Sequence, residues 1–359
     1  MELGISVYTS DEYTYEKNMK YIQMAKNLGV PNVFTSFNIS SSKKEIEKTI
    51  DLIRYIKKEG LHTSVDVSSQ IFKRFNAKID NLSVFYDMGI DEIRIDYGFS
   101  AEDIAYMSNN NMGISIVINA STSDSSYMEE ILRYGGNMTN IGACHNFYPR
   151  RYTGLSHSFY NAKNDMLKEY GLEISSFIPS DTGRRGPLYE GLPTLEEHRK
   201  MPSYAAAKDL IYGSMTDRLY LGDAYASKQE IEDILGIDKE TVELGVHLFD
   251  GVSCEERQII FKDCHTNRRD ASEYLVRSVE ARVDNTSNIE SFNCIDRKYG
   301  SITIDNINMG RYMGELQIVR TALPADPRVN VVGRVAESDI RCLKYIHPGK
   351  KFALIEEDR

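Results

Sequence analysis

The chain of 359 residues is long enough to bury one large hydrophobic core or two ordinary ones. Its apolar content of 41% and charged content of 27% are typical of a globular protein in water. The net charge of −10 repels nucleic acids and anionic membrane surfaces, so we expect neither as a partner. An anionic small molecule remains compatible with this charge if it binds in a local basic pocket.

The N-terminal residues contain no basic segment followed by an apolar one, and no run in the chain approaches the ~20 apolar residues of a membrane span. We therefore expect a cytoplasmic protein. The five cysteines are scattered and form no CxxC pair, which favours free thiols over a disulfide framework or a zinc site.

Short apolar runs alternate with helical patterns over the first 235 residues. The predicted strands cover residues 3–8, 33–37, 63–67, 92–97, 114–119, 138–144, 172–178 and 218–221. The predicted helices cover residues 16–28, a segment capped by the serines at 40–42, and residues 82–88, 101–108, 127–134, 156–170, 202–212 and 228–235. Apolar strands are typical of a parallel sheet covered on both faces, and eight such units in ~250 residues predict a TIM (β/α)8 barrel.

A doubly wound open sheet is the alternative fold. The chain has no GxGxxG motif after a strand and no Walker A motif, so nucleotide-binding versions of that fold lose their main support.

The pattern changes after Gly236, where short β-rich runs separated by turn residues replace the helical periods. We expect a barrel domain over residues 1–238 and a small, mostly-β domain over residues 239–359. The predicted strands of this second domain cover residues 280–283, 301–304, 316–319, 329–335 and 352–355. Residues 237–265 are interpreted as an extra barrel-side segment or as a linker.

Two loops concentrate polar and aromatic residues, HNFYPRRYTGLS at 145–156 and PSDTGRRGPLYEGLPTLEEHR at 179–199. They follow the sixth and seventh predicted strands, so they should be neighbours at the mouth of a barrel. Amide and imidazole groups suit sugar hydroxyls, aromatic rings suit a sugar face, and guanidinium groups suit phosphate. The expected substrate-binding residues are Tyr8, Asn119, His145, Asn146, Tyr148, Arg150, Arg185, Glu190 and Arg311.

Four aspartates lie at or just after the ends of predicted strands, namely Asp66, Asp96, Asp181 and Asp223. Carboxylates that face one another across a barrel mouth suit glycoside cleavage or a divalent metal. The chain has no HxH or HExxH motif, and we expect neither a metal nor a cofactor. We interpret Asp96 and Asp223 as the acid–base pair, with Asp66 and Asp181 in reserve; each could instead cap a helix or a loop.

Several motifs resemble the MupG family. They are GISVY at 4–8, IDYGFS at 95–100, NFYPR at 146–150, TGLS at 153–156, RGPLYEGLPTLEEHR at 185–199, LGDAYAS at 221–227 and GRYMGELQIVR at 310–320. The resemblance spans both predicted domains and departs from the expected pattern at Arg151, where proline is expected.

The resemblance implies a TIM barrel followed by a cyclophilin-like β-barrel. It also implies a cytoplasmic 6-phospho-N-acetylmuramidase that cleaves a phosphorylated amino-sugar disaccharide, N-acetylmuramic acid 6-phosphate joined to N-acetylglucosamine, in peptidoglycan recycling. It does not assign the catalytic pair.

Two other functions stay open from the residues alone. A non-catalytic carbohydrate-binding or outer-surface protein would not need aspartates at strand ends. A sugar-phosphate lyase or isomerase would need a Schiff-base lysine or metal ligands there, and the predicted strand ends show neither.

The polar motif GRYMGELQ, with Arg311 and Glu315, stands out in an otherwise plain β-domain. We expect this domain to help complete the site, from the same chain or from a neighbouring subunit. Whether the chain forms a homo-oligomer is left open by the sequence.

Overall fold

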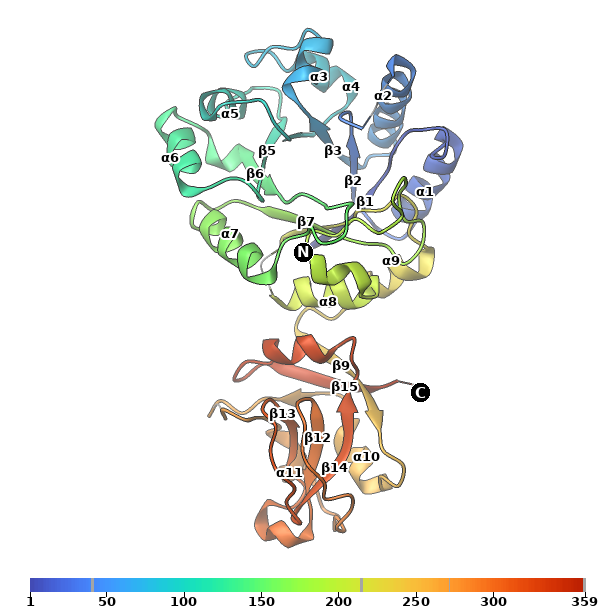
Figure 1. Cartoon of the computed structure of the whole chain (residues 1–359), viewed down its shortest axis with the longest axis vertical. Coiled ribbons are helices and arrows are strands. Elements are labelled where there is room, and N and C mark those ends of the chain that lie inside the picture. Colours follow the sequence, from blue (N-terminus) through green and yellow to red (C-terminus); the bar gives the residue numbers. More distant parts are fainter. Residues whose placement is uncertain (40–41, 214–215, 271, 358–359) are drawn as a thin grey trace. The chain divides into compact units, whose positions relative to one another are not determined.

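The computed structural model describes residues 1–39, 42–213, 216–270 and 272–357, and the chain divides into two compact units, Met1–Gly236 and Ile237–Arg359 (Figure 1). The N-terminal unit is a closed barrel of eight parallel strands in chain order, which confirms the predicted TIM barrel. Its strands are β1 (Glu2–Ser6), β2 (Asn32–Ser36), β3 (His62–Val67), β4 (Glu92–Ile95), β5 (Ser115–Asn119), β6 (Ile141–Cys144), β7 (Ile174–Ile178) and β8 (Arg218–Leu221).

Helices surround this barrel (Figure 1). They are α1 (Tyr15–Asn27), α2 (Lys43–Lys58), α3 (Ser69–Arg74), α4 (Ser83–Met88), α5 (Ala101–Ser108), α6 (Ser125–Arg133), α7 (His157–Glu169), α8 (Ser203–Gly213) and α9 (Lys228–Leu235). Helix α3 was not predicted. Residues 138–140, predicted as strand, form a short 3-10 turn before β6 instead, because the Asn137 side chain caps that turn.

The sequence signals at the helix ends act as expected. Ser42 caps α2 and exchanges hydrogen bonds with Glu45 in a capping box; residues 40 and 41 of the predicted cap lie outside the described residues. Gly29 and Gly60 follow α1 and α2 with positive φ, the left-handed conformation that ends a helix at little cost for glycine.

Aromatic side chains fill the barrel interior. Phe34 on β2, Phe177 on β7 and Tyr220 on β8 are buried, and their ring centroids lie 5.1 to 5.9 Å apart. Gly4 on β1 pairs with Tyr220 in the strand register, and a Cβ atom at Gly4 would lie 2.4 Å from the tyrosine ring. The missing side chain at Gly4 therefore makes the space that Tyr220 occupies.

The C-terminal unit is mostly β, as predicted, and its seven strands pair in the order β10-β15-β9-β14-β12-β13-β11. Its elements are β9 (Thr241–Leu248), α10 (Cys254–Ile260), β10 (His265–Thr266), β11 (Leu275–Arg277), α11 (Glu280–Asp284), β12 (Ser301–Asp305), β13 (Leu316–Val319), β14 (Val329–Val335) and β15 (Lys351–Glu356), with 3-10 segments at Ile307–Tyr312 and Ile340–Tyr345.

Two predictions for this unit were wrong. Residues 280–283 belong to helix α11, since glutamate, alanine and arginine favour a helix and Ser278 accepts the N–H of Ala281. Residues 237–265 are neither a linker nor part of the barrel, because they contain β9, which pairs with β14 and β15 in the C-terminal sheet.

We expect Gly4→Ala to lower the free energy of unfolding by about 1–3 kcal/mol, because the added methyl group overpacks the interior against Tyr220. Urea denaturation of the full chain measures this loss. Gly142→Ala in β6 is the matched control, since its Cβ would meet nothing closer than 3.4 Å. An equal loss in both variants would contradict the packing argument.

Candidate active site

A layer of polar side chains lies directly above the aromatic layer, at the C-terminal ends of the strands. Ser36, Asp66 and Arg94 come from β2, β3 and β4 and are partners in the register, Ser36 with Asp66 and Asp66 with Arg94. The alternation of side chains along a strand puts Ser36 on the same side as Phe34, two residues earlier. The buried charged side chains of this layer, Asp66 and Arg94, therefore lie at the C-terminal end of the barrel, where barrel enzymes bind their substrates.

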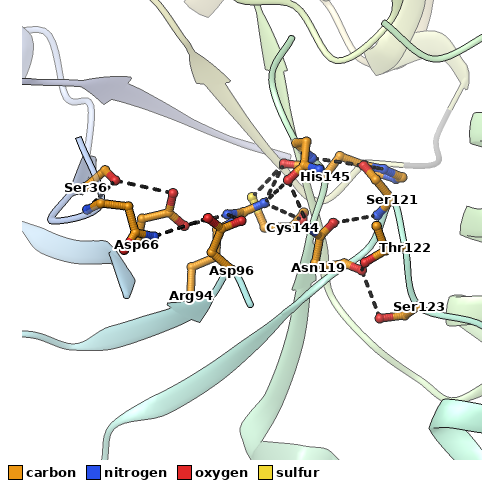
Figure 2. A network of polar contacts seen from close by, with 12 residues as sticks. Ser36, Asp66, Arg94, Asp96, Asn119, Ser121, Thr122, Ser123, Cys144 and His145 are labelled. Carbon is orange, nitrogen blue, oxygen red and sulfur yellow. Dashed lines mark hydrogen bonds and ion pairs between the residues drawn. The ribbon is translucent and has the colours of Figure 1, made fainter. Parts of the chain in front are cut away.

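Arg94 is the centre of this layer and is 3% exposed (Figure 2). Its Nη1 donates to Asp66 Oδ1 at 2.5 Å and lies 3.7 Å from Asp96 Oδ1. Its Nη2 donates to Asn146 Oδ1 at 2.6 Å, and Asn119 donates to the same oxygen at 3.0 Å. One guanidinium thus connects side chains from β3, from the end of β4 and from the loop after β6.

The charges in this layer influence one another. Burial raises the pKa of the Asp66 carboxyl, and the charge of Arg94 opposes that change. Burial also acts against the charged form of Arg94, but Asp66 holds its pKa above the ordinary value. Because a guanidinium keeps its proton at any ordinary pH, Arg94 is a fixed positive charge beside two carboxyl groups.

Asp66 and Asp96 stand close together across Arg94. Their Oδ1 atoms lie 2.5 and 3.7 Å from the same nitrogen, so these oxygens are separated by no more than the sum of the two distances. That limit applies to one pair of oxygens and is compatible with the ~5–5.5 Å between the carboxyls of retaining glycosidases. Asp96 is the more accessible of the two, and Asn38 donates to its Oδ2 at 3.2 Å.

A cavity of about 340 Å³ opens over this layer. Both aspartates line it, and aromatic and basic side chains from the loops after β6 and β7 complete the wall. The lining residues are Ser36, Asn38, Ile39, Asp66, Arg94, Asp96, Asn146, Phe147, Tyr148 and Arg185.

Arg185 brings a second guanidinium to the cavity. Its Cζ atom lies 4.4 Å from the ring centroid of Tyr8 and 5.0 Å from that of Phe147, so two aromatic faces hold it in place. Its Nη1 is buried and has no hydrogen-bond partner within the described part of the chain. A buried donor without a partner is costly, and an anionic ligand in the cavity would satisfy it. Tyr8 itself is buried and supports Arg185 from below, with its hydroxyl donating to Gly222 O at 2.7 Å.

Asp223 lies under the loop after β7 and away from the cavity lining. Its carboxylate is buried and accepts the backbone N–H groups of Ser180 and Arg185 at 2.9 Å and of Leu192 at 3.3 Å. Burial raises the pKa of Asp223, and these three N–H groups oppose the change. Asp223 therefore shapes the loop that presents Arg185, and the structure does not bring it together with Asp96.

Asp181 is also occupied elsewhere. Its carboxylate accepts the backbone N–H of Ser203 at 3.0 Å and the Ser203 hydroxyl at 2.9 Å, so it caps the start of α8.

His145 lies below the cavity, fully buried. Its Nε2 is 2.7 Å from Asn164 Oδ1 and its Nδ1 is 3.1 Å from Ser121 Oγ, which in turn accepts the N–H of Asn146 at 3.0 Å. Burial lowers the pKa of His145 to about 4, so the ring is neutral at neutral pH. The neutral ring therefore positions Asn146, which lines the cavity, while His145 does not reach it.

The other predicted binding residues are spread around the loops. Tyr148 lines the cavity, whereas Arg150 is exposed and lies outside the lining residues. Glu190 pairs with Arg151 at 2.9 Å, so the arginine that replaces the expected proline has an ion-pair partner in the next loop.

Arg311 belongs to the C-terminal unit. It is exposed there, and its guanidinium lies 4.8 Å from the ring centroid of Tyr312. Glu315 is buried and pairs with Arg277 at 2.6 Å.

One residue that holds the two loops together was missed by the sequence reasoning. Arg199 is 3% exposed, donates twice to Glu196 at 2.7 Å, and also donates to the carbonyls of Gly191 and Arg150 at 3.1 Å. Glu196 accepts the N–H of Gly154 at 2.8 Å, and its hydrogen bonds with Arg199 lower its pKa to about 2. The loop after β6 is thereby fixed to the loop after β7.

Arg94 was missed as well, although the sequence contains a signal for it. It stands between Ile93 and Ile95 in β4. Because side chains alternate along a strand, Arg94 points into the barrel while the two isoleucines face the helices. A buried cation needs a partner, so this position predicts a neighbouring carboxylate.

A group of possible metal ligands lies outside the cavity lining. Side-chain atoms of His157, Glu197 and Asp209 lie within 4.8 Å of one another. Asp209 Oδ2 is 3.3 Å from His157 Nε2 and 3.0 Å from His198 Nε2, so these groups already pair among themselves. We derive no catalytic step from this cluster.

A TIM barrel with two neighbouring aspartates at its mouth has the pair of carboxyls that a barrel glycosidase requires. The family comparison is more specific. Residues 3–235 match the N-terminal model of the 6-phospho-N-acetylmuramidases, and residues 242–355 match the C-terminal model. The chain therefore belongs to the 6-phospho-N-acetylmuramidase family, MupG, which confirms the resemblance and makes the protein a glycosidase by family.

Two solved structures are similar over nearly the whole chain. One, described as an uncharacterized protein of B. cereus, is 33% identical, with a TM-score of 0.88 and 99% of each chain covered. The other, a conserved Enterococcus faecalis protein with an unknown function, is 34% identical, with a TM-score of 0.76 and 99% of this chain and 97% of that chain covered. No curated protein matches the chain significantly. Among the described helices, none is both long and apolar enough to span a membrane.

We expect the stability of the protein to depend on pH through His145. Its pKa is about 4 in the folded chain and 6.5 ordinarily, so the unfolded chain takes up the proton first as the pH falls. The stabilisation from the neutral ring is complete above pH ~6.5 and is lost as the pH falls toward ~4. At ~1.4 kcal/mol per pKa unit, the loss amounts to about 3 kcal/mol.

Urea denaturation at about pH 7 and pH 4.5 measures this loss, and His145→Gln provides the comparison. The difference in unfolding free energy between the two pH values should shrink by about 2–3 kcal/mol in the variant. The same pH dependence in both proteins would show that His145 is not the responsible group.

Proposed function

We propose that the protein hydrolyses the β-1,4 bond between N-acetylmuramic acid 6-phosphate and N-acetylglucosamine, in the intracellular recycling of peptidoglycan. The family match supports this substrate. The observation that supports it best is the cavity itself, which Asp66 and Asp96 line together with Arg185, a half-buried arginine whose buried Nη1 has no protein partner among the described residues. Such a cavity suits a sugar with an anionic substituent.

Asp96 is the proton donor in this proposal. It is the more accessible carboxyl of the pair and lines the cavity, so it can reach a glycosidic oxygen. Its proton passes to the oxygen of the leaving N-acetylglucosamine while the bond to the anomeric carbon breaks. Water then attacks the anomeric carbon, leaves its hydroxyl there and returns a proton to Asp96.

Asp66 is the second carboxylate. It is held by Arg94 and Ser36, and its negative charge faces the positive charge that develops on the sugar ring. Two routes are compatible with its place: direct attack on the anomeric carbon, or orientation of the substrate's own acetamide for that attack. Both routes involve two successive displacements at the anomeric carbon and would therefore retain its configuration.

Arg185 binds the 6-phosphate in this proposal. The Tyr8 and Phe147 rings fix its plane, and the N–H contact to Asp223 fixes its backbone, so little conformational freedom is lost when an anion binds. The phosphate on C6 would accept from the Nη1 atom, for which the described part of the chain supplies no acceptor.

We expect Asp96→Asn to lower kcat on the phosphorylated disaccharide by at least ~10²-fold with the fold intact, because general acid catalysis contributes ~10²–10⁴-fold. The same variant should retain most activity on 6-phospho-N-acetylmuramyl fluoride, whose leaving group needs little protonation. Asp66→Asn should lose activity on both substrates.

Asp181→Asn is the control for these rates, because Asp181 caps α8 outside the cavity lining. It should keep its kcat on both substrates and lose only some stability. A near-normal kcat for Asp96→Asn on the disaccharide would remove Asp96 from the acid role.

We expect Arg185→Ala to lower the preference for phosphorylated over unphosphorylated disaccharide roughly tenfold to a hundredfold, since a charge-assisted hydrogen bond contributes about 1.5–3 kcal/mol. The ratio of kcat/KM for the two substrates measures this preference. Arg150→Ala, an exposed arginine outside the lining residues, should leave the ratio unchanged. An equal loss on both substrates in Arg185→Ala would contradict the assignment.

A further inference from the structure

A second cavity of about 310 Å³ lies beside the first, between the ends of β4 and β5 and the starts of α5 and α6. Asp96 lines both cavities. Figure 2 shows Asp96 between Asp66 on one side and the Asn119–Ser123 segment on the other, which agrees with a shared wall. The lining of the second cavity also includes Tyr97, Phe99, Asn119, Thr122, Asp124 and Tyr127.

The two cavities differ in charge. The first contains Arg94 and Arg185, whereas none of the described residues that line the second is basic, and Asp96 and Asp124 are both acidic. An anionic group would be repelled from the second cavity and attracted to the first. Of the two sugars of the disaccharide, the second cavity therefore suits the uncharged one.

Its polar and aromatic groups have the character of a sugar site. Tyr97 is 50% exposed and offers a ring face, and Tyr127 and Phe99 pack partly against the core beneath. The Thr122 hydroxyl, the Asn119 amide and the Asp124 carboxylate can exchange hydrogen bonds with hydroxyl groups. Asp124 also accepts the N–H of Tyr127 at 2.9 Å, so its position is fixed by the start of α6.

We propose that this second cavity binds the uncharged leaving sugar, N-acetylglucosamine, and that the scissile bond crosses the wall at Asp96. The inference rests on the proposed function. It assigns a direction to the substrate: the phosphorylated ring lies in the first cavity toward Arg185, and the leaving ring lies toward Tyr97. A proton donor at the shared wall is then next to the oxygen that joins the two rings.

The test compares two substrates of the full-length protein. The phosphorylated disaccharide fills both cavities, whereas 6-phospho-N-acetylmuramyl fluoride has no second sugar. Tyr97→Ala should lower kcat/KM on the disaccharide about tenfold, which is the loss of one aromatic contact of ~1.4 kcal/mol, and should change kcat/KM on the fluoride less than about twofold. Tyr106→Ala, which removes an exposed tyrosine of α5 outside both linings, should change neither value.

A second measurement follows N-acetylglucosamine directly. In a direct binding titration of the full-length protein, it should bind about tenfold more weakly to Tyr97→Ala than to the unchanged protein. Equal effects of Tyr97→Ala on both substrates, or no effect on either, would overturn the subsite while the proposed function stands. If the unchanged protein hydrolyses neither substrate, the proposed function fails and the subsite fails with it.

Discussion

The barrel mouth depends on one buried ion pair, Arg94 with Asp66. Arg94 cannot lose its proton, so the carboxyl groups around it are held near a permanent positive charge. Removing Arg94 alone would leave Asp66 buried without a counter-charge, a change that costs ~3–5 kcal/mol in buried pairs. The same guanidinium also orients Asn146, so the floor of the cavity and its two aspartates depend on a single side chain.

The loops above this floor are built by satisfying backbone groups. Asp223 accepts three N–H groups of the loop after β7, and Arg199 donates to the carbonyls of both loops. Loops without regular structure leave many polar groups to be paired, and buried charged side chains supply the partners here. Asp223 and Arg199 are residue types that often act in catalysis, but here they stabilise the loops. The backbone groups that they bind in these loops distinguish this structural role from a catalytic one.

The sequence allowed the barrel to be predicted because its signals are local: apolar strands, helix caps and glycines that end helices. The site was harder, since it depends on which side chains meet. Asp96 and Asp223 look alike along the chain, each after a strand, but one faces a cavity and the other is buried beneath a loop. Arg94 could have been found from its place between two isoleucines. The partners of Arg199 within its own loop, Glu196 and Gly191, do not distinguish it from a surface arginine. Its role in joining the two loops depends on the carbonyl of Arg150, 49 residues away in the chain.

The three hydrogen bonds to Asp223 have a consequence for how the loop after β7 can move. The residues that donate them, Ser180, Arg185 and Leu192, span most of that loop and converge on one carboxylate. If one of these N–H groups moves away, its hydrogen bond is lost and water reaches the carboxylate, which weakens the other two hydrogen bonds. Partial opening of the loop is therefore unfavourable. The loop should resist opening at one donor alone, and the place of Arg185 in the cavity depends on all three hydrogen bonds.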